Sequence, residues 1–231
     1  MSEKVIGILG GMGPEATADF FAKVVASSPA KCDQDHLRII IDNNPKIPDR
    51  TQAILNANES PLPTLVKTAK NLEKAGVDFI VIPCNTAHYF YEDLIREISI
   101  PILHMIREVV NAVKASLPKC KRVGLLATTG TTTSNLYQKD FQKEGIEVIT
   151  PDAQSQAEVM DAILRIKAGQ AKNRARKQLI KAGNLLIERK AEALILGCTD
   201  IPVVIKTTDF AVPVFDSNIV LAEATVKFAR S

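Results

Sequence analysis

The sequence has no tryptophan and only three tyrosines, and its four cysteines lie far apart. Because no two cysteines form a C-x-x-C pair, neither a disulfide framework nor a zinc knuckle is predicted, and free thiols are expected. No hydrophobic run approaches the roughly 20 residues that a membrane-spanning helix requires. The amino end has no basic segment followed by a long apolar stretch, which argues against a signal peptide. These absences predict a cytoplasmic protein that does not bind a membrane.

The composition is that of a globular protein. Of 231 residues, 46% are hydrophobic and 24% are charged, which fits one large domain or two small ones. The net charge of +3 is small and favours anionic small molecules without implying nucleic acid. The densest basic stretch, residues 167–181, has its basic residues at helical spacing and is interpreted as a solvated helix face. Nucleic acid is therefore not expected as a partner.

Short β-branched runs alternate with longer helical patterns along the whole chain. This alternation is typical of βαβ units and predicts an α/β fold with mainly parallel sheets. Pro14 suits the first turn of a helix ending near Ser27, and Gly76 and Gly145 suit helix ends. The predicted strands are Lys4–Leu9, Leu37–Asp42, Asp78–Pro83, Ile100–His104, Arg122–Ala127, Glu147–Thr150, Ala193–Gly197 and Val212–Asp216.

Three segments of the first half recur in the second half in the same order. The paired segments are Gly7–Gly13 with Gly124–Gly130, Phe79–Cys84 with Ala193–Cys198, and Ile100–His104 with Val212–Asp216. Each pair is separated by close to half the chain length. The recurrence predicts two similar doubly wound α/β halves related by a pseudo-twofold axis.

Cys84 and Cys198 each follow directly after one of these equivalent strands. Ligands of parallel α/β sheets collect at the carboxyl ends of the strands, so both thiols are candidates for a site. A pseudo-twofold axis would place the two thiols opposite each other at the interface of the halves. A thiol just before a helix amino terminus also has its thiolate form favoured.

Two opposed thiols suit the inversion of a stereocentre. A proton removed from one face of a planar carbanion must return to the other face, which a single base cannot do. The pKa of an unperturbed cysteine is near 8.5, so that one thiolate base and one thiol acid coexist near neutral pH with modest tuning. The pair therefore predicts proton transfer that inverts a carbon stereocentre.

The glycine-rich loop after the first strand has two interpretations. Residues 11–16 fit the pattern G-x-G-x-x-A of a dinucleotide site, and Asp42 resembles its ribose-binding acid. The same loop of amides before a helix would also bind a substrate carboxylate. The equivalent loop of the second half, Ala127–Thr133, offers hydroxyls and amides but no dinucleotide pattern, which favours the carboxylate. Met12 and Thr131 are the candidate substrate-binding residues of these loops.

The chain resembles the aspartate/glutamate racemase family, and within it the aspartate racemase branch. The resemblance spans nearly the whole chain and rests on Gly7–Thr17, Pro83–His88, Val123–Thr128 and Gly197–Thr199. It implies racemisation without pyridoxal phosphate or any other cofactor, no metal, and a homodimer. It also implies that the domains exchange their last strands, with a first domain of residues 1–98 plus 210–231 and a second domain of residues 99–209.

The resemblance also assigns roles to single residues. Cys84 and Cys198 are the implied catalytic residues. Arg50 is the implied carboxylate-binding arginine, and Lys167 the lysine at a second carboxylate. The residues that bind the substrate beside the cysteines are Asn85, Thr86 and Thr199. The implied substrate is a small dicarboxylic amino acid, aspartate first and glutamate second.

Two departures from the family pattern bear on the substrate. Asp200 stands where many relatives have glutamate, which keeps a carboxylate there. The glutamate racemase branch has an Asp-Ser dipeptide in the first loop and His-Tyr-Pro after the second cysteine motif, and this chain has neither. A glutamate-specific enzyme is therefore disfavoured.

Several alternatives remain at this point. A glutamate racemase, a hydantoin racemase and a maleate isomerase would all use cysteine at these positions. A hydantoin has no carboxylate and would leave Arg50 and Lys167 without a ligand. From other classes, the chain could be a binder of small anions or nucleotides, or a redox protein with a Cys84–Cys198 disulfide; thermal shift with NAD and thiol counting separate these.

Overall fold

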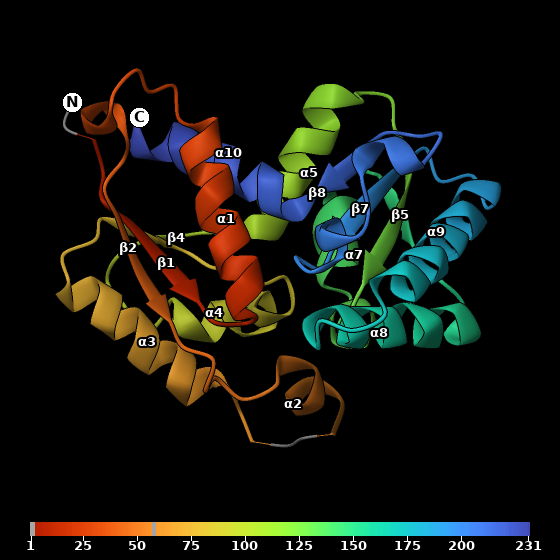
Figure 1. Ribbon diagram of the computed structural model, residues 1–231, viewed down its shortest axis with the longest axis horizontal. Coiled ribbons are helices and arrows are strands. Elements are labelled where there is room, and N and C mark those ends of the chain that lie inside the picture. Colours follow the sequence, from red (N-terminus) through yellow and green to blue (C-terminus); the bar gives the residue numbers. More distant parts are fainter. Residues whose placement is uncertain (1–2, 57–58) are drawn as a thin grey trace. The chain divides into compact units, whose positions relative to one another are not determined.

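The computed structural model describes residues 3–56 and 59–231. The chain divides into two compact units, residues 1–108 with 218–231, and residues 109–217 (Figure 1). Each unit contains one sheet of four strands. The predicted α/β fold with two domains is confirmed.

The sheet of the first unit is entirely parallel and has the strand order β2-β1-β3-β4. Its strands are β1 (Ile6–Gly10), β2 (Ile39–Asn43), β3 (Phe79–Val81) and β4 (Ile102–Leu103). All five residues of β1 are buried, because helices cover both faces of the sheet. The strand-end residues Gly10, Asn43 and Val81 therefore reach the same edge.

Helices α1 (Pro14–Ser27) and α10 (Ser217–Ala229) cover one face of this sheet, and α3 (Leu62–Lys74) and α4 (Tyr91–Leu94) cover the other. Ile6 and Ile8 pack with Phe20 of α1, while Leu9 packs with the apolar residues of α3, as the alternation along a strand requires. Pro14 occupies the predicted first turn of α1. The remaining elements of the first unit are η1 (Asp33–Asp35), α2 (Arg50–Asn56) and η2 (Thr86–Phe90).

The sheet of the second unit has the equivalent order β6-β5-β7-β8, again all parallel. Its strands are β5 (Arg122–Ala127), β6 (Glu147–Ile149), β7 (Ala193–Gly197) and β8 (Val214–Asp216). The recurring sequence segments thus occupy equivalent strands, β1 with β5, β3 with β7 and β4 with β8. Equal strand order in the two units confirms that the chain contains an internal repeat.

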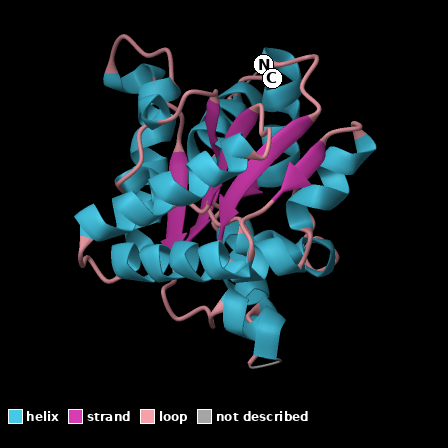
Figure 2. Ribbon diagram, turned by 90° about the vertical axis from the view of Figure 1, so that its right-hand side faces the viewer, coloured by secondary structure: helices cyan, strands magenta, loops and turns pink. Residues whose placement is uncertain are grey.

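Two long helices, α8 (Ala153–Lys167) and α9 (Lys172–Glu188), pack together on one face of the second sheet. Tyr137 of α7 (Leu136–Lys143) lies on the other face, against Gly197. Figure 2 shows cyan helices on both sides of the magenta strands. The remaining elements are α6 (Thr129–Thr133), η3 (Ile201–Val203) and η4 (Thr207–Asp209), and α5 (Met105–Ser116) contains the boundary between the units.

The division of the chain differs from the expected 1–98 plus 210–231 and 99–209. Strand β4 pairs with β3 and stays in the first unit, and β8 pairs with β7 and stays in the second. No strand is exchanged in the described structure, and only α10 returns to the first unit. Its apolar residues, including Leu221 and Val226, pack with Phe20, and the Phe228 ring contacts Phe79 edge-to-face at 4.8 Å.

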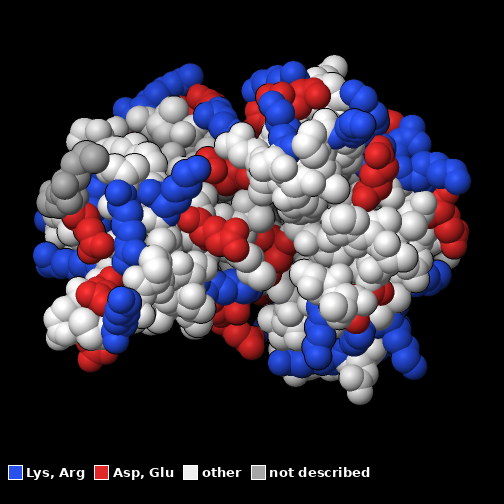
Figure 3. Space-filling model, turned by 90° about the horizontal axis from the view of Figure 1, so that it is seen from above, with Lys and Arg blue, Asp and Glu red and all other residues white. Residues whose placement is uncertain are grey.

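Charged side chains of both signs are interspersed on the face shown in Figure 3. On α9, Lys172, Arg174 and Lys177 are exposed while Ala175 and Leu179 are buried, which is the solvated helix face that the spacing predicts. In residues 3–56 and 59–231, no helix is long and apolar enough to span a membrane.

Candidate functional site

Cys84 lies beyond the carboxyl end of β3 in the first unit. The thiol residue is 6% exposed and belongs to an apolar cluster with Met12 and Ile47. Its backbone N–H donates to the carbonyl of Ile82 at 2.8 Å, which turns the chain sharply at this point. Met12, from the loop after β1, and Cys84, from the loop after β3, are therefore brought together as expected.

The imidazole of His88 holds the backbone of Cys84. The Met105 N–H donates to Nε2 at 3.1 Å, so the proton sits on Nδ1, which donates to the Cys84 carbonyl at 2.9 Å. Burial lowers the pKa of His88 to about 4, so the ring is neutral at physiological pH. His88 is therefore a structural histidine that ties the Cys84 turn to the first residue of α5.

The glycines of the first loop are required by the packing of the chain itself. Gly11 has φ +95°, and a Cβ there would lie within 2.6 Å of the Asn44 backbone. The Gly11 N–H donates to Thr17 Oγ1 at 2.9 Å, and a Cβ on Gly10 would overlap the same threonine. Because that amide already has a partner, it does not serve a pyrophosphate, and the nucleotide interpretation of this loop gains no support.

Arg50 begins α2, which packs against η2. Its Nη1 donates to the carbonyls of Ile47 at 3.2 Å and Pro48 at 2.9 Å, which fixes the guanidinium. Its Nε is buried and has no hydrogen-bond partner among the described residues. A buried N–H without an acceptor costs about 1–3 kcal/mol, so this atom is suited to receive a ligand oxygen.

Asn85 and Thr86 follow Cys84 and are 2% and 5% exposed. They stand at the start of η2, the element against which α2 packs. The sheet edge of the first unit thus carries the expected residues Met12, Arg50, Cys84, Asn85 and Thr86 in neighbouring loops. Burial of the two polar side chains makes them suitable for orienting a small ligand.

Cys198 takes the equivalent position in the second unit, directly after β7, and is also 6% exposed. Ala127 and Gly197 are partners in the register of β5 and β7, so Thr128 and Cys198 leave neighbouring strands at the same level. Thr131 is fully buried, and its hydroxyl lies 3.0 Å from that of Thr128, which caps α6. Thr199 is 3% exposed.

A carboxylate that sequence reasoning treated only as a family departure joins two site residues. Cys198 Sγ donates to Asp200 Oδ2 at 3.4 Å, and Lys167 Nζ lies 2.9 Å from the same oxygen. The Asp200 side chain is 7% exposed and that of Lys167 is 33% exposed. The structure thus places Lys167, the last residue of α8, beside the second cysteine. The whole of α9 and the whole of β7 separate Lys167 from Asp200 in the sequence, so no local pattern indicates this contact.

Tyr137 is a second buried polar residue that sequence reasoning missed. Its side chain is fully buried against Gly197, the residue before Cys198. Burial raises the pKa of Tyr137 above its ordinary range, so its phenol is neutral. A tyrosine on an amphipathic helix gives no sequence signal for such a position.

The helix expected after each cysteine is short. Cys84 precedes η2, a 3₁₀ helix of five residues, and Cys198 precedes η3, which has three. The dipole effect of a helix depends on aligned peptide groups over several turns. The expectation that a helix amino terminus favours the thiolate at both cysteines therefore gains no support from these short 3₁₀ helices.

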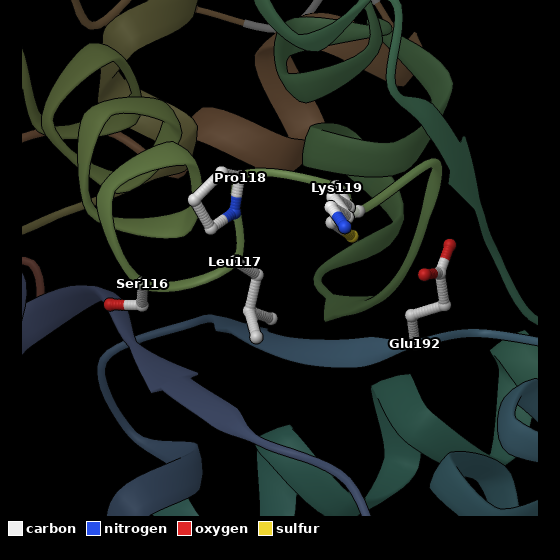
Figure 4. Close-up of a pocket in the computed structure, with 6 residues that line it drawn as sticks. Ser116, Leu117, Pro118, Lys119 and Glu192 are labelled. Carbon is white, nitrogen blue, oxygen red and sulfur yellow. The ribbon is translucent and has the colours of Figure 1, made fainter.

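One pocket of the second unit lies away from these residues. A pocket of about 380 Å³ is lined by residues 116–120 and Glu192, which precede β5 and β7 (Figure 4). It therefore sits at the amino ends of the strands, whereas Cys198 follows a carboxyl end. Cys120 in this pocket is buried, and burial raises the pKa of its thiol, which makes it unreactive.

A model of the Asp/Glu/hydantoin racemase family matches residues 9–225. The chain belongs to this family. The family resemblance inferred from the cysteine motifs is thus confirmed.

In residues 3–56 and 59–231, no group of three or more His, Cys, Asp or Glu residues could hold a metal ion.

Several similar proteins are named as racemases. A broad-specificity amino-acid racemase of Bacillus subtilis is 33% identical over 228 residues, covering 96% of each chain. The solved structure of Picrophilus torridus aspartate racemase is 36% identical, with a TM-score of 0.88, over 98% of this chain and 94% of that chain. An aspartate racemase homologue from Pyrococcus horikoshii is 28% identical, with a TM-score of 0.80, over 99% and 100%.

The buried neutral His88 predicts an acid-sensitive fold. Its pKa is about 4 in the folded chain and near 6.5 when unfolded, so the unfolded chain binds more protons between these values. The stabilisation is complete above pH 6.5 and is lost as the pH falls towards 4. We expect about 2 kcal/mol less stability from this group at pH 5 than at pH 8.

Urea denaturation of the wild type, His88→Asn and His36→Asn at pH 8 and pH 5 measures this slope. The exposed His36 provides the control, and its variant should keep the wild-type pH dependence. The difference in the free energy of unfolding between pH 8 and pH 5 should be about 2 kcal/mol smaller in His88→Asn than in the wild type. An unchanged difference in His88→Asn would contradict the assignment of a neutral, buried ring.

Proposed function

We propose that this member of an amino-acid racemase family interconverts L- and D-aspartate, with glutamate as a weaker substrate. Cys84 and Cys198 are the two acid–base groups, and no cofactor takes part. The observation that carries the proposal is the matched position of two buried thiols, each in the loop that follows the third strand of its unit, in two sheets of equal strand order. Similarity to Picrophilus torridus aspartate racemase supports aspartate as the substrate.

The proposed reaction transfers one proton out and one proton in. A thiolate on one side takes the α-proton, the Cα–H bond breaks, and its electron pair remains on a planar carbanion conjugated with the carboxylate. The thiol on the other side then gives its proton to the opposite face of Cα. The cysteines end with exchanged protonation states, so the next turnover runs from the other enantiomer.

Arg50 and Lys167 would each bind one of the two carboxylates of the substrate. Arg50 offers a fixed guanidinium whose Nε is buried without an acceptor, and a carboxylate binds such a group through charge-assisted hydrogen bonds. Lys167 would bind the second carboxylate. Asn85, Thr86, Thr131 and Thr199 would orient the ligand by hydrogen bonds, and Met12 would provide an apolar wall. A hydantoin has no carboxylate and would leave the positive charge of Arg50 without an anionic partner.

A wider range of side chains is the second candidate. The Bacillus subtilis relative is named a broad-specificity racemase. The contact between Lys167 and Asp200 favours this candidate, because the ammonium of Lys167 already has a carboxylate partner within the chain.

Arg50→Ala should weaken substrate binding much more than folding. Loss of a carboxylate contact removes a charge-assisted interaction, about 1.5–3 kcal/mol, which corresponds to a rise in KM of about 10- to 100-fold. The side chain is half-buried at a helix start, so the melting temperature should move by only a few degrees. Arg50→Lys keeps the charge without the planar fork and should be intermediate. Wild-type kinetics in Arg50→Ala would contradict its role.

The cysteine variants test the division of labour between the thiols. Cys84→Ala and Cys198→Ala should each lose racemisation, by about 10²- to 10⁴-fold or more for a general acid or base. A single remaining thiol can still exchange the α-proton of the one enantiomer that presents it. Exchange in deuterium oxide, followed by proton NMR, should therefore survive with opposite enantiomers in the two variants.

Cys120→Ala is the matched control, because Cys120 is buried to the same degree as the other two cysteines but lies at the amino ends of the strands. It should racemise both enantiomers at close to the wild-type rate. Two-way racemisation by Cys84→Ala or by Cys198→Ala would eliminate the two-thiol mechanism.

A further inference from the structure

Asp200 is a buried acid that connects a candidate catalytic group to a candidate binding group. One oxygen, Oδ2, accepts the hydrogen bond from Cys198 Sγ and lies 2.9 Å from Lys167 Nζ. The side chain is 7% exposed, so water screens this pair less than it screens an ion pair on the surface. The two charges therefore compensate each other at this point of the second unit.

The position of Lys167 fits a partner for a substrate side chain. It is the last residue of α8, where the helix dipole favours a cation, and one third of its side chain remains exposed. Leu164 lies one turn earlier on the same helix and is 54% exposed, which places an apolar surface beside the ion pair. Uncharged side chains can pack on such a surface without losing a charge partner.

The pairing of Lys167 with Asp200 changes which substrate side chains can bind at Lys167. A substrate carboxylate at Lys167 would share the ammonium with Asp200, and the two carboxylates would repel each other at a distance of a few ångströms. An uncharged amide or hydroxyl side chain meets no such repulsion. The preference for a dicarboxylic amino acid is therefore smaller than a lone lysine would give.

We propose that Asp200 is a specificity-determining residue that neutralises Lys167 and extends the substrate range from aspartate to amino acids with uncharged side chains. This rests on the proposed racemase function, because it assigns Lys167 to the side-chain end of the site. Asparagine is the sharpest probe, since it has the shape of aspartate without the negative charge. The wild type racemises both.

The test compares Asp200→Asn with the wild type on aspartate and asparagine. Removal of the Asp200 charge removes its repulsion of a substrate carboxylate at Lys167, so the ratio of kcat/KM for aspartate to that for asparagine should rise about tenfold. Because Asp200 also contacts Cys198, the dissociation constants of both amino acids are measured by calorimetry alongside the kinetics. Their ratio should shift in the same direction even if turnover falls.

Two controls identify the cause of the shift. Asp209→Asn removes another largely buried carboxylate of the same unit, one that pairs with Arg176 at 2.6 Å, and should leave the ratio unchanged. In the double variant Lys167→Met with Asp200→Asn, the tenfold increase should disappear, because the cation that causes it is gone.

Three results would overturn the proposal. These are a wild type that racemises aspartate but not asparagine, an unchanged or lower aspartate preference in Asp200→Asn, and a shift of equal size in Asp209→Asn. A wild type that racemises no amino acid would instead refute the proposed function. The binding ratio would still decide whether Asp200 sets the charge preference.

Discussion

Both units depend on one constraint, which is that a buried parallel strand can present functional groups only at its carboxyl end. The inner strands β1, β3 and β7 are buried along their whole length, so these strands present functional groups only where they end. In both units a cysteine follows the third strand in chain order, three residues after the end of β3 at Val81 and directly after the end of β7 at Gly197. The proposed proton transfer to both faces of one carbon needs two such groups, and the internal repeat places one cysteine at the equivalent position of each unit.

The surroundings of the two cysteines differ although their backbone positions are equivalent. Cys84 is held through its carbonyl by the neutral ring of His88, and its thiol lies among apolar residues. Cys198 instead donates from its thiol to the carboxylate of Asp200, which also meets Lys167. The first unit therefore fixes the position of its thiol through the backbone, whereas the second unit sets the charge around it.

Local patterns were sufficient to predict most of the fold. All eight strands occur where β-branched runs stand between turn residues, and α1 has the predicted bounds because Pro14 specifies its first turn. The assignment of residues 210–231 was wrong because strand pairing is a tertiary choice: Val214–Asp216 hydrogen-bonds to the free edge of β7, and only α10 packs on the first sheet. The expected homodimer stays a prediction.

Site residues that follow the cysteines in the sequence were predicted, whereas contacts between residues far apart in the sequence were missed. Asn85, Thr86 and Thr199 follow the thiols directly, whereas the contact of Lys167 with Asp200 depends on how α8 packs on its sheet. Likewise, only the folded structure shows that Arg50 Nε is buried without a hydrogen-bond partner among the described residues.

Exchange of the α-proton tests the central claim, that two thiols of this chain racemise an amino acid without a cofactor. Purified wild-type protein is incubated under reducing conditions with L- or D-aspartate in deuterium oxide, and proton NMR and chiral chromatography follow the α-position. Both enantiomers should lose the α-proton, and each should give the other with deuterium at Cα. Absence of exchange with aspartate and with glutamate would contradict the account.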